Sequence, residues 1–595
     1  MIKKLTIIIA AAILAGSHAH AQGIELDRFY TFECDDVPAT ISAGNGRLSI
    51  SGKHFREGEH SLRWDFSEKD VLSLRQDLMF EHKDTTGKDT YLSSFVFWVY
   101  NEKPFKEKMT VEFLKEGKIC SWFEMGMDFT GWRGACISYE RDMQGCPATG
   151  MDEIRMSSPA SEGTIYIDHL VTASKIDSRF QSPDVHLPFV NKDTKNHWLL
   201  VYRHSLMEPD IELTPLTDMQ VADMEIMSER FRSTLYEPKP FTAGRMEKLR
   251  KGFGYYRISY DGDGAVTGRP IFMVRHSEIY ERFFPNWRKQ MFAQDGNEFD
   301  PFFELMKAVA IGYCDAKEHG DKEELKRMFL SMYDYITDLG VAAGSSWGYC
   351  HHYGYNIRGL YPAYFLMKDV LKEAGKLKQA EETMRWYAIT NEVYPKPAKN
   401  GIVIDQFNTH MEGRIASMLI MEDSPEKVRY LRSFSRWLDY GSRPSDGLSG
   451  SFKTDGTCFH HCNHYPAYAT GGLDGAVNAL YCLSGTGFRI SEYAHSTIKN
   501  VLLTMRFYCN THQWPLVLSG RHPNGKNRLV PIHYGLMAKA GTPDGSSAID
   551  TEMAKAFLRL TAPLKKKSRY EKKLEKELLA SGITPEDTPQ GSKSL

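Results

Sequence analysis

One short segment, residues 451–472, gathers more chemically active side chains than any other part of the chain. Its Gly- and Pro-punctuated loop holds three histidines and two tyrosines: His460, His461, His464, Tyr465 and Tyr468. Further along, residues 519–523 read Ser-Gly-Arg-His-Pro and add a cation, Arg521. Histidine and tyrosine can act as general bases or acids, and arginine can stabilise negative charge. Together these residues could remove a proton from a carbon next to a carboxylate, which is the chemistry of β-elimination.

Two other interpretations of this loop stay open at this point. The three histidines with Cys458 and Cys462 suggest a metal site, but Cys-x3-Cys with interspersed histidines lacks the paired spacing of a structural zinc site. The loop could also be a packed, hydrogen-bonded turn in which the rings have a structural role only.

A second loop, residues 347–358, reads Trp-Gly-Tyr-Cys-His-His-Tyr-Gly-Tyr-Asn-Ile-Arg and precedes a predicted helix. Aromatic faces suit sugar rings, and His and Arg suit carboxylates and sulfates. The loop could instead be an aromatic plug between helices. Neither this loop nor residues 458–468 contains Asp or Glu, which disfavours a glycoside hydrolase because that reaction needs two carboxylates.

Composition and the amino terminus limit the function classes. The 595 residues carry 74 Lys+Arg against 76 Asp+Glu, so no global basic charge indicates nucleic-acid binding. Lys3 and Lys4 precede an apolar run, and Ala19-His20-Ala21 fits a cleavage site, which predicts a signal peptide over residues 1–21. Ser17 stands where a lipoprotein would have its lipidated Cys. We therefore expect an exported protein, periplasmic or secreted, with no membrane partner.

The cysteines do not indicate a disulfide framework. Ten are scattered through a chain long enough to form a core without disulfides. If a local bridge forms, Cys120 with Cys136 or Cys146 is the best candidate.

The hydrophobic period changes along the chain. Before about residue 174, short alternating runs between turns predict a jelly-roll β-sandwich. The expected strands are Phe29–Cys34, Arg47–Ser51, Ser61–Phe66, Tyr91–Tyr100, Thr110–Phe113, Trp122–Met127, Ala135–Tyr139 and Thr164–Ile167. From about Pro215 the period is helical. The expected helices are Phe299–Ala316, Lys322–Leu339, Tyr361–Glu373, Gln379–Asn391, Gly413–Met421, Glu426–Leu438, Leu473–Leu483 and Ser491–Cys509.

These patterns predict a multidomain α and β protein, with an amino-terminal jelly roll over residues 22–200 and an α/α toroid over residues 201–563. Residues 564–595 read as a charged linker.

Three motifs in this order resemble the chondroitin sulfate ABC lyases, a family of polysaccharide lyases. They are the 347–358 loop, the segment from Asp455 to Tyr468 in which His461 and Tyr468 are seven apart, and Gly520-Arg521-His522-Pro523. The resemblance covers most of the chain and implies a jelly roll followed by a toroidal lyase domain. It also implies that His461, Tyr468 and Arg521 are catalytic. The substrate contacts that it implies are His351, His352, Tyr355, Arg358 and His460.

The implied substrate is a sulfated glycosaminoglycan, chondroitin or dermatan sulfate. Its uronate carboxylate must be neutralised before the C5 proton can leave, which we assign to His351 or His352 with Arg521. Tyr468 would act as base and then acid for glucuronate, with Arg521 favouring its phenolate because an unperturbed tyrosine has a pKa near 10. His461 would be the base for iduronate, whose proton lies on the opposite face. No step requires a cofactor.

The resemblance also implies that family members continue into carboxy-terminal β-sandwich domains, from which a glutamate completes the active site. We therefore expect an incomplete toroid with weakened turnover, a β-sandwich partner chain if the gene is split, or a non-catalytic glycosaminoglycan-binding protein. Glu33, His60 and Asp168 resemble the structural cation site of carbohydrate-binding jelly rolls and predict bound calcium or sodium. Ordinary strand-end carboxylates are the alternative.

Overall fold

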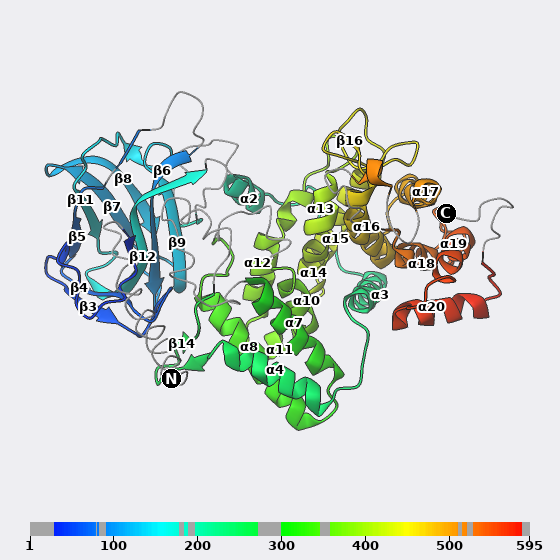
Figure 1. Cartoon of the computed structure of the whole chain (residues 1–595), viewed down its shortest axis with the longest axis horizontal. Helices are drawn as coiled ribbons and strands as arrows, with labels where there is room; N and C mark the ends of the chain where they lie inside the picture. Colours follow the sequence, from blue (N-terminus) through cyan, green and yellow to red (C-terminus); the bar gives the residue numbers. More distant parts are fainter. Residues whose placement is uncertain are drawn as a thin grey trace, which may run out of the picture. The chain divides into compact units, whose positions relative to one another are not determined.

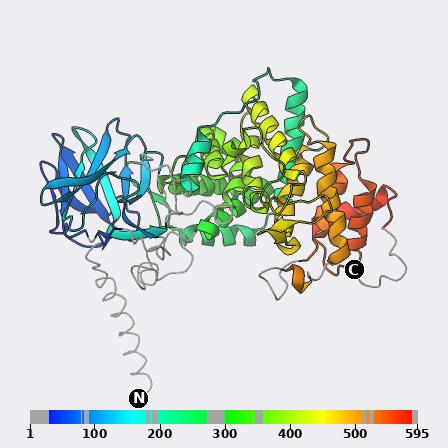
Figure 2. The same ribbon diagram turned by 90° about the horizontal axis from the view of Figure 1, so that it is seen from above.

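The structure is a computed structural model of the chain (Figures 1 and 2). It describes residues 29–78, 80–82, 91–177, 184–187, 197–271, 299–345, 357–509, 515–519 and 528–585. The predicted signal peptide lies outside these residues.

The chain divides into two compact units that do not follow chain order. The first contains the residues up to Arg203 together with Thr242–Val309 and Glu318–His352. The second contains His204–Phe241, Ala310–Lys317 and the residues from Tyr353 onward.

Two six-stranded antiparallel sheets form the sandwich of the first unit. One has the order β3 (Arg47–Ser51), β4 (Ser61–Ser67), β12 (Glu162–Asp177), β6 (Tyr91–Asn101), β9 (Gly131–Ser138), with β1 (Phe29–Tyr30) also paired to β12. The other has the order β10 (Gln144–Gly145), β8 (Lys118–Gly126), β7 (Lys108–Lys115), β11 (Glu153–Ser157), β5 (Val71–Arg75), β2 (Ile41–Ala43). Chain connections such as β4 to β5, β6 to β7 and β11 to β12 cross between the sheets, as in a jelly roll.

Side-chain alternation explains how the two sheets bury one core. In β4, Leu62, Trp64 and Phe66 are buried, whereas Arg63 and Asp65 between them are half-exposed. Rings from the two sheets meet in the core, where Phe95 of β6 lies 5.2 Å from Phe113 of β7 between ring centroids. The eight predicted strands overlap β1, β3, β4, β6, β7, β8, β9 and β12, while β2, β5, β10 and β11 were not predicted.

Helices make up most of the rest, which confirms a β-sandwich followed by a helical region. The first unit also contains α4 (Ala243–Tyr255), α8 (His319–Asp338) and the hairpin β13 (Ser259–Tyr260) and β14 (Val266–Thr267). The division between the units falls within two helices, α2 (His197–Ser205) and α7 (Phe299–Asp315).

The second unit contains the larger helical set. Its members are α3 (Asp218–Leu235), α10 (Leu360–Leu366), α11 (Lys368–Glu373), α12 (Leu377–Tyr387), η2 (Thr390–Val393), α13 (Ile404–Thr409), α14 (Met411–Leu419), α15 (Pro425–Ser442), α16 (Pro466–Leu483), α17 (Glu492–Tyr508), η3 (Leu516–Leu518), α18 (Pro531–Ala540), α19 (Thr551–Thr561) and α20 (Arg569–Ala580).

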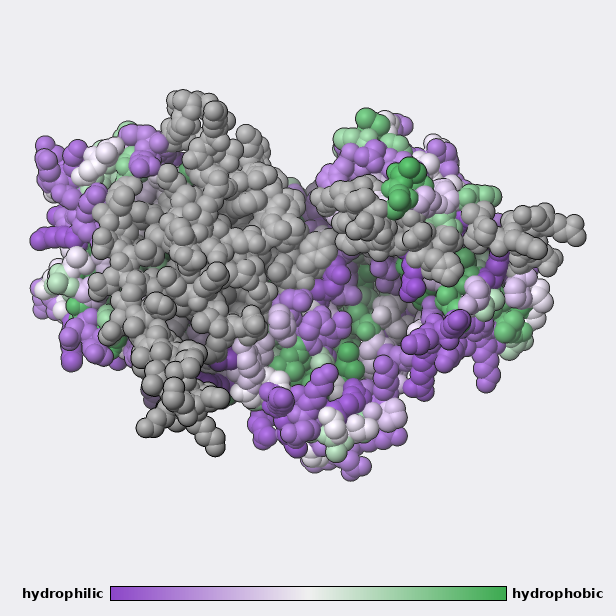
Figure 3. Space-filling model, viewed as in Figure 1, coloured by the Kyte–Doolittle hydropathy of each residue, from purple (hydrophilic) through white to green (hydrophobic). Residues whose placement is uncertain are grey.

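Local signals explain where several of these helices begin. The hydroxyl groups of Ser424, Ser491 and Ser568 accept a hydrogen bond from the first turn of α15, α17 and α20. Helix α20 buries Leu574 and Leu578, and Figure 3 shows hydrophilic residues gathered over its outer side. Within residues 564–595, which the sequence predicted to be a charged linker, the structure forms a helix over Arg569–Ala580.

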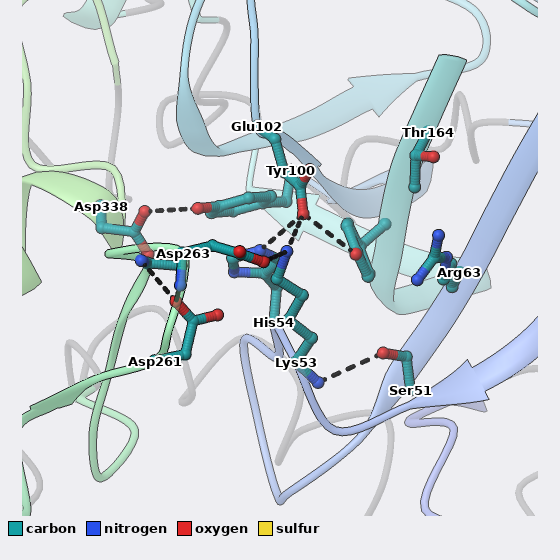
Figure 4. A network of polar contacts seen from close by, with 12 residues as sticks. Ser51, Lys53, His54, Arg63, Tyr100, Glu102, Thr164, Asp261, Asp263 and Asp338 are labelled. Carbon is teal, nitrogen blue, oxygen red and sulfur yellow. Dashed lines mark hydrogen bonds and ion pairs between the residues drawn. The ribbon is translucent and has the colours of Figure 1, made fainter. Parts of the chain in front are cut away.

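A polar network joins the sandwich to the helical part of the first unit (Figure 4). The hydroxyl of Tyr100 donates to Asp338 Oδ1 at 2.8 Å. The ring of His54 stacks on Tyr100 at 3.9 Å between centroids, and its Nε2 lies 3.2 Å from Glu102 Oε1. Lys53 also reaches Glu102, at 2.7 Å. Burial lowers the pKa of His54 to about 4 and raises that of Asp338 to about 7.

The candidate disulfide does not form. Nine of the ten cysteines lie in the described residues, and none of these nine, Cys120, Cys136 and Cys146 included, forms a disulfide. The Cys146 amide donates to the Cys120 carbonyl at 2.8 Å, so strand pairing brings these backbones together without joining the sulfur atoms. Within the described residues, no helix has the length and apolar character needed to cross a membrane.

Candidate functional site

The His- and Tyr-rich segment forms a tight hairpin followed directly by a helix. Strands β15 (Phe459–His460) and β16 (Asn463–His464) pair through a two-residue turn, His461-Cys462. Both turn residues have positive φ, 50° and 63°. Positive φ at both central residues is typical of a type I′ hairpin turn, and residues other than glycine rarely adopt it. Such backbone conformations cost about 1–3 kcal/mol and concentrate at functional sites. His461, in this turn, is exposed to solvent.

Tyr468 lies in the first turn of α16, which begins with Pro466 at its first position. The ring of His460 stacks on Tyr468, with centroids 4.1 Å apart and planes 15° apart. His461 lies against His460 at 4.0 Å, and its ring is 6.4 Å from that of Tyr468. The structure therefore brings together His460, His461 and Tyr468, as the sequence predicted.

A carboxylate that sequence reasoning missed completes this cluster. The hydroxyl of Tyr468 donates to Asp405 Oδ1 at 2.6 Å, and His460 Nε2 lies 3.9 Å from Asp405 Oδ2. The His460 side chain is 5% exposed and that of Asp405 45% exposed, so the cluster runs from the interior to the surface. Nothing local marks Asp405, because it lies 63 residues before Tyr468 on a different helix, α13.

Glycines on α16 allow α13 to come this close. A Cβ at Gly475 would lie 1.9 Å from the Phe407 carbonyl oxygen, and one at Gly472 would lie 2.4 Å from the Ile404 side chain. Both distances are far inside van der Waals contact, so α13 can pack here only against residues that lack a side chain. The run Thr-Gly-Gly-Leu-Asp-Gly at 470–475 is the one sequence signal for this approach.

Neighbouring contacts anchor α13. Gln406 donates to Glu392 at 2.7 Å, and Glu392 also pairs with the buried Arg414. Burial opposes ionisation of Glu392, but the Arg414 guanidinium outweighs it and holds the pKa of this carboxyl below its ordinary value. Arg358, a predicted substrate contact, donates to the Asn408 carbonyl at 2.9 Å. The end of the 347–358 loop is thereby tied to the helix that carries Asp405.

Other residues of the hairpin have structural environments. His464 Nδ1 lies 3.3 Å from the Cys458 amide nitrogen and 3.2 Å from its carbonyl oxygen, and its ring packs edge-on against Tyr508. Burial lowers the pKa of His464. Tyr465 is buried, and among the described residues its hydroxyl has no hydrogen-bond partner. The packed-turn interpretation therefore fits His464, and not the exposed His461.

Comparison with known proteins places this geometry in a family. Residues 211–568 match the family model "Lyase, catalytic", and residues 26–189 match "Lyase, N terminal". A chondroitin sulfate ABC exolyase of Bacteroides thetaiotaomicron is 52% identical over 98% of the chain. The chain belongs to the chondroitin sulfate ABC lyase family. An exolyase and an endolyase of Proteus vulgaris are 30% and 25% identical over 95% and 94% of the chain.

The chain spans 59%, 57% and 57% of the length of these three ABC lyases. Of the site residues implied by the resemblance to the ABC lyases, four lie outside the described residues: His351, His352, Tyr355 and Arg521. A few residues before Arg521 in the sequence, η3 is described, and its Leu516 and Val517 are exposed. The assigned roles of all these residues stay predictions.

The predicted cation ligands lie in the jelly roll, where Glu33 and Asp168 both accept hydrogen bonds from the segment that joins β3 to β4. Glu33 Oε1 accepts from the amides of Glu59 and His60 at 2.9 and 2.8 Å. Asp168 Oδ2 accepts from the Arg56 and Glu57 amides at 2.7 and 3.0 Å.

Burial raises the pKa of Glu33, Glu57 and Asp168, that of Glu57 to about 8. Among the described residues, no group of three or more His, Cys, Asp and Glu side chains is arranged to hold a metal. A calcium or sodium ion that used backbone oxygens as further ligands stays a prediction.

Proposed function

We propose that this chain cleaves chondroitin and dermatan sulfate by β-elimination at the uronic acid, leaving unsaturated oligosaccharides. The observation that carries the proposal is the arrangement around Tyr468. Its ring stacks on His460, its hydroxyl donates a hydrogen bond to Asp405, and His461 lies beside His460, exposed to solvent. Family membership and relatives described as chondroitin sulfate ABC lyases support it. The predicted signal peptide is consistent with a reaction outside the cytoplasm.

The reaction breaks the C5–H bond and the C4–O4 bond, forms a C4=C5 double bond and returns a proton to O4. Tyr468 takes the C5 proton of glucuronate and then protonates the departing O4. A general base must lie within about 3 Å of the proton that it removes. The ring stack with His460 and the hydrogen bond to Asp405 hold the Tyr468 hydroxyl in one position, as this requires. His351, His352 and Arg521 are the candidates to neutralise the substrate carboxylate.

Asp405 changes how Tyr468 can act as a base. A carboxylate beside the hydroxyl disfavours a second negative charge there, so a free phenolate would need a cation such as Arg521 to offset it. A shared proton avoids this problem: Tyr468 passes its own proton toward Asp405 as it accepts the one from C5. The tyrosine then stays close to neutral throughout the step.

His461 provides a second base for iduronate. Its ring is exposed and does not stack on Tyr468, so it can approach a sugar from another side. His460 is buried under Tyr468, which favours a positioning role for it over the predicted substrate contact.

The deciding experiment is an ultraviolet assay of the unsaturated uronate that only elimination creates. The purified chain is incubated with chondroitin 4-sulfate, chondroitin 6-sulfate and dermatan sulfate, with EDTA present. It is tested alone and with the remaining β-sandwich region of a relative added in trans.

We expect ultraviolet-absorbing products, strongest when the added region is present. New reducing ends without ultraviolet absorbance would indicate hydrolysis and overturn the proposal. Saturable binding of the polymer without turnover under either condition would instead identify a glycosaminoglycan-binding protein. Activity that EDTA abolished and calcium restored would contradict the metal-free mechanism.

A further inference from the structure

The hairpin that carries His461 is too short to hold its own shape. Its strands, β15 and β16, pair through two residues each. An isolated two-stranded hairpin is marginally stable at best in water. The turn between the strands also has a strained backbone, with positive φ at His461 and Cys462. Contacts from outside the two strands must therefore fix the position of His461.

One such contact closes the open end of the hairpin. Cys458, the residue before β15, is fully buried. Its amide donates to Nδ1 of His464, the last residue of β16, at 3.3 Å. The His464 ring also packs edge-on against Tyr508, the last residue of α17, with centroids 5.2 Å apart. His464 therefore joins the two ends of the hairpin to each other and to a helix outside it.

The backbone of Cys458 defines the tautomer of His464. Among the described residues, the Cys458 amide has His464 Nδ1 as its only acceptor, whereas the Cys458 carbonyl already accepts from the Tyr465 amide at 2.8 Å. A buried amide without an acceptor is unfavourable, so Nδ1 carries no proton and Nε2 carries it. Burial lowers the pKa of His464, against the opposing effects of the Cys458 hydrogen bond and Asp455. The ring is therefore neutral at neutral pH.

We propose that His464 is a positioning residue for the lyase reaction. As the neutral tautomer with its proton on Nε2, it holds the Cys458 amide, anchors the hairpin on α17 and thereby sets where His461 meets the substrate. The proposal rests on the proposed function, in which His461 is the base for iduronate. Tyr468 lies on α16 and is bonded to Asp405, both outside the hairpin, so His464 should matter more for dermatan than for chondroitin cleavage.

The first measurement is turnover of His464→Leu on dermatan sulfate and on chondroitin 4-sulfate, in the ultraviolet assay with the β-sandwich region added. Leucine fills much of the volume of the ring but cannot accept from the Cys458 amide. Misplacing a catalytic group by about 1 Å can cost about 10²-fold, so we expect kcat on dermatan to fall by at least about tenfold. The loss on chondroitin should be smaller, with KM near that of the wild type on both polymers.

His464→Asn is the matched control. Its side-chain oxygen can take the place of Nδ1 as the acceptor, so this variant should recover most of the dermatan turnover that His464→Leu loses. A residue that only filled space would not distinguish the two substitutions in this way.

The second measurement does not require turnover. Amide hydrogen exchange, measured by mass spectrometry on peptides that contain residues 458–464, reports how readily the hairpin opens. This segment should exchange faster in His464→Leu than in the wild type, and at close to the wild-type rate in His464→Asn. Peptides from α15 should exchange equally in all three proteins.

The two measurements separate this inference from the proposed function. Faster exchange in His464→Leu, with no turnover by the wild type, would contradict the proposed function and support the anchoring role. Unchanged exchange in His464→Leu, or equal losses of turnover on the two polymers, would overturn the inference. If His464→Leu does not fold, ring-nitrogen NMR spectra of the histidine-labelled wild type decide the question, with His464→Asn assigning the signal. A proton on Nδ1 would overturn the inference, and a proton on Nε2 would support it.

Discussion

Both units of this molecule contain a histidine stacked on a tyrosine whose hydroxyl donates a hydrogen bond to an aspartate. In the first unit His54 stacks on Tyr100 at 3.9 Å, and the Tyr100 hydroxyl donates to Asp338 at 2.8 Å. In the second unit His460 stacks on Tyr468 at 4.1 Å, and the Tyr468 hydroxyl donates to Asp405 at 2.6 Å. Residue types and pairwise contacts therefore do not separate a structural cluster from a chemical one.

The two clusters differ in their surroundings. Tyr100 and His54 are both buried, and Glu102 with its partner Lys53 completes the His54 network. Tyr468 is half-buried, its Asp405 partner is partly exposed, and the adjoining hairpin turn has a strained backbone. Access for a substrate, together with strain maintained by the surrounding fold, is what makes the second cluster a candidate for chemistry.

Replacing Tyr by Phe in each cluster should give the largest difference in turnover between the two clusters. Tyr468→Phe keeps the ring stack and removes only the hydroxyl, so turnover should fall about 10²–10⁴-fold on both substrates while polymer binding stays near that of the wild type. The matched variant Tyr100→Phe should leave turnover unchanged and lower the free energy of unfolding by about 1–2 kcal/mol. Steady-state rates and denaturant unfolding check both. A Tyr468→Phe rate above about a tenth of wild type would rule out its catalytic role.

His461→Ala should separate the two epimers. We expect dermatan cleavage to fall about 10²-fold and chondroitin cleavage much less, because only iduronate presents its proton to the face assigned to this histidine. Parallel assays on the two polymers measure the ratio. Equal losses would point to a role shared by both substrates, such as neutralising the uronate carboxylate.

Asp405→Asn should lower turnover by about tenfold and change its pH dependence. The amide cannot accept a proton from Tyr468, and it removes a charge that disfavours the phenolate, so the profile of kcat/KM should move to lower pH. A merely structural role would lower the rate without moving the profile. Asp338→Asn is the matched control and should leave both unchanged.

His54→Gln should change stability and leave turnover unaffected. The folded pKa of His54 is about 4, below the unfolded value of about 6.5, so the unfolded chain binds this proton first as the pH falls. The stabilisation that His54 contributes is therefore complete above about pH 6.5 and lost toward pH 4. As the pH falls through this window, the free energy of unfolding of the wild type should drop by about 2–3 kcal/mol more than that of the variant. Parallel pH dependences for the two proteins would contradict the assignment.

Much of the fold could be predicted because the pattern that signals it is local. Alternating runs such as Ser61–Phe66 predicted β4, and helical periods predicted α8 and α17. Strands β5 and β11 were missed, although β5 alternates between buried and more exposed residues over five positions, as a half-buried strand does. The candidate pair Cys120 and Cys146 is not bridged, because neighbouring backbones do not ensure that two sulfur atoms meet.

The sequence by itself determined the contents of the catalytic candidate: two adjacent histidines, a tyrosine seven residues after the second, and a proline that begins the helix between them. These positions are close along the chain, so a hairpin and one helical turn suffice to bring them together. Only the tertiary structure decided that Asp405 joins them, because that contact requires α13 to press against the glycines of α16. It also decided which His–Tyr–Asp cluster is buried and which is reached by solvent, since burial depends on packing between segments far apart in the chain.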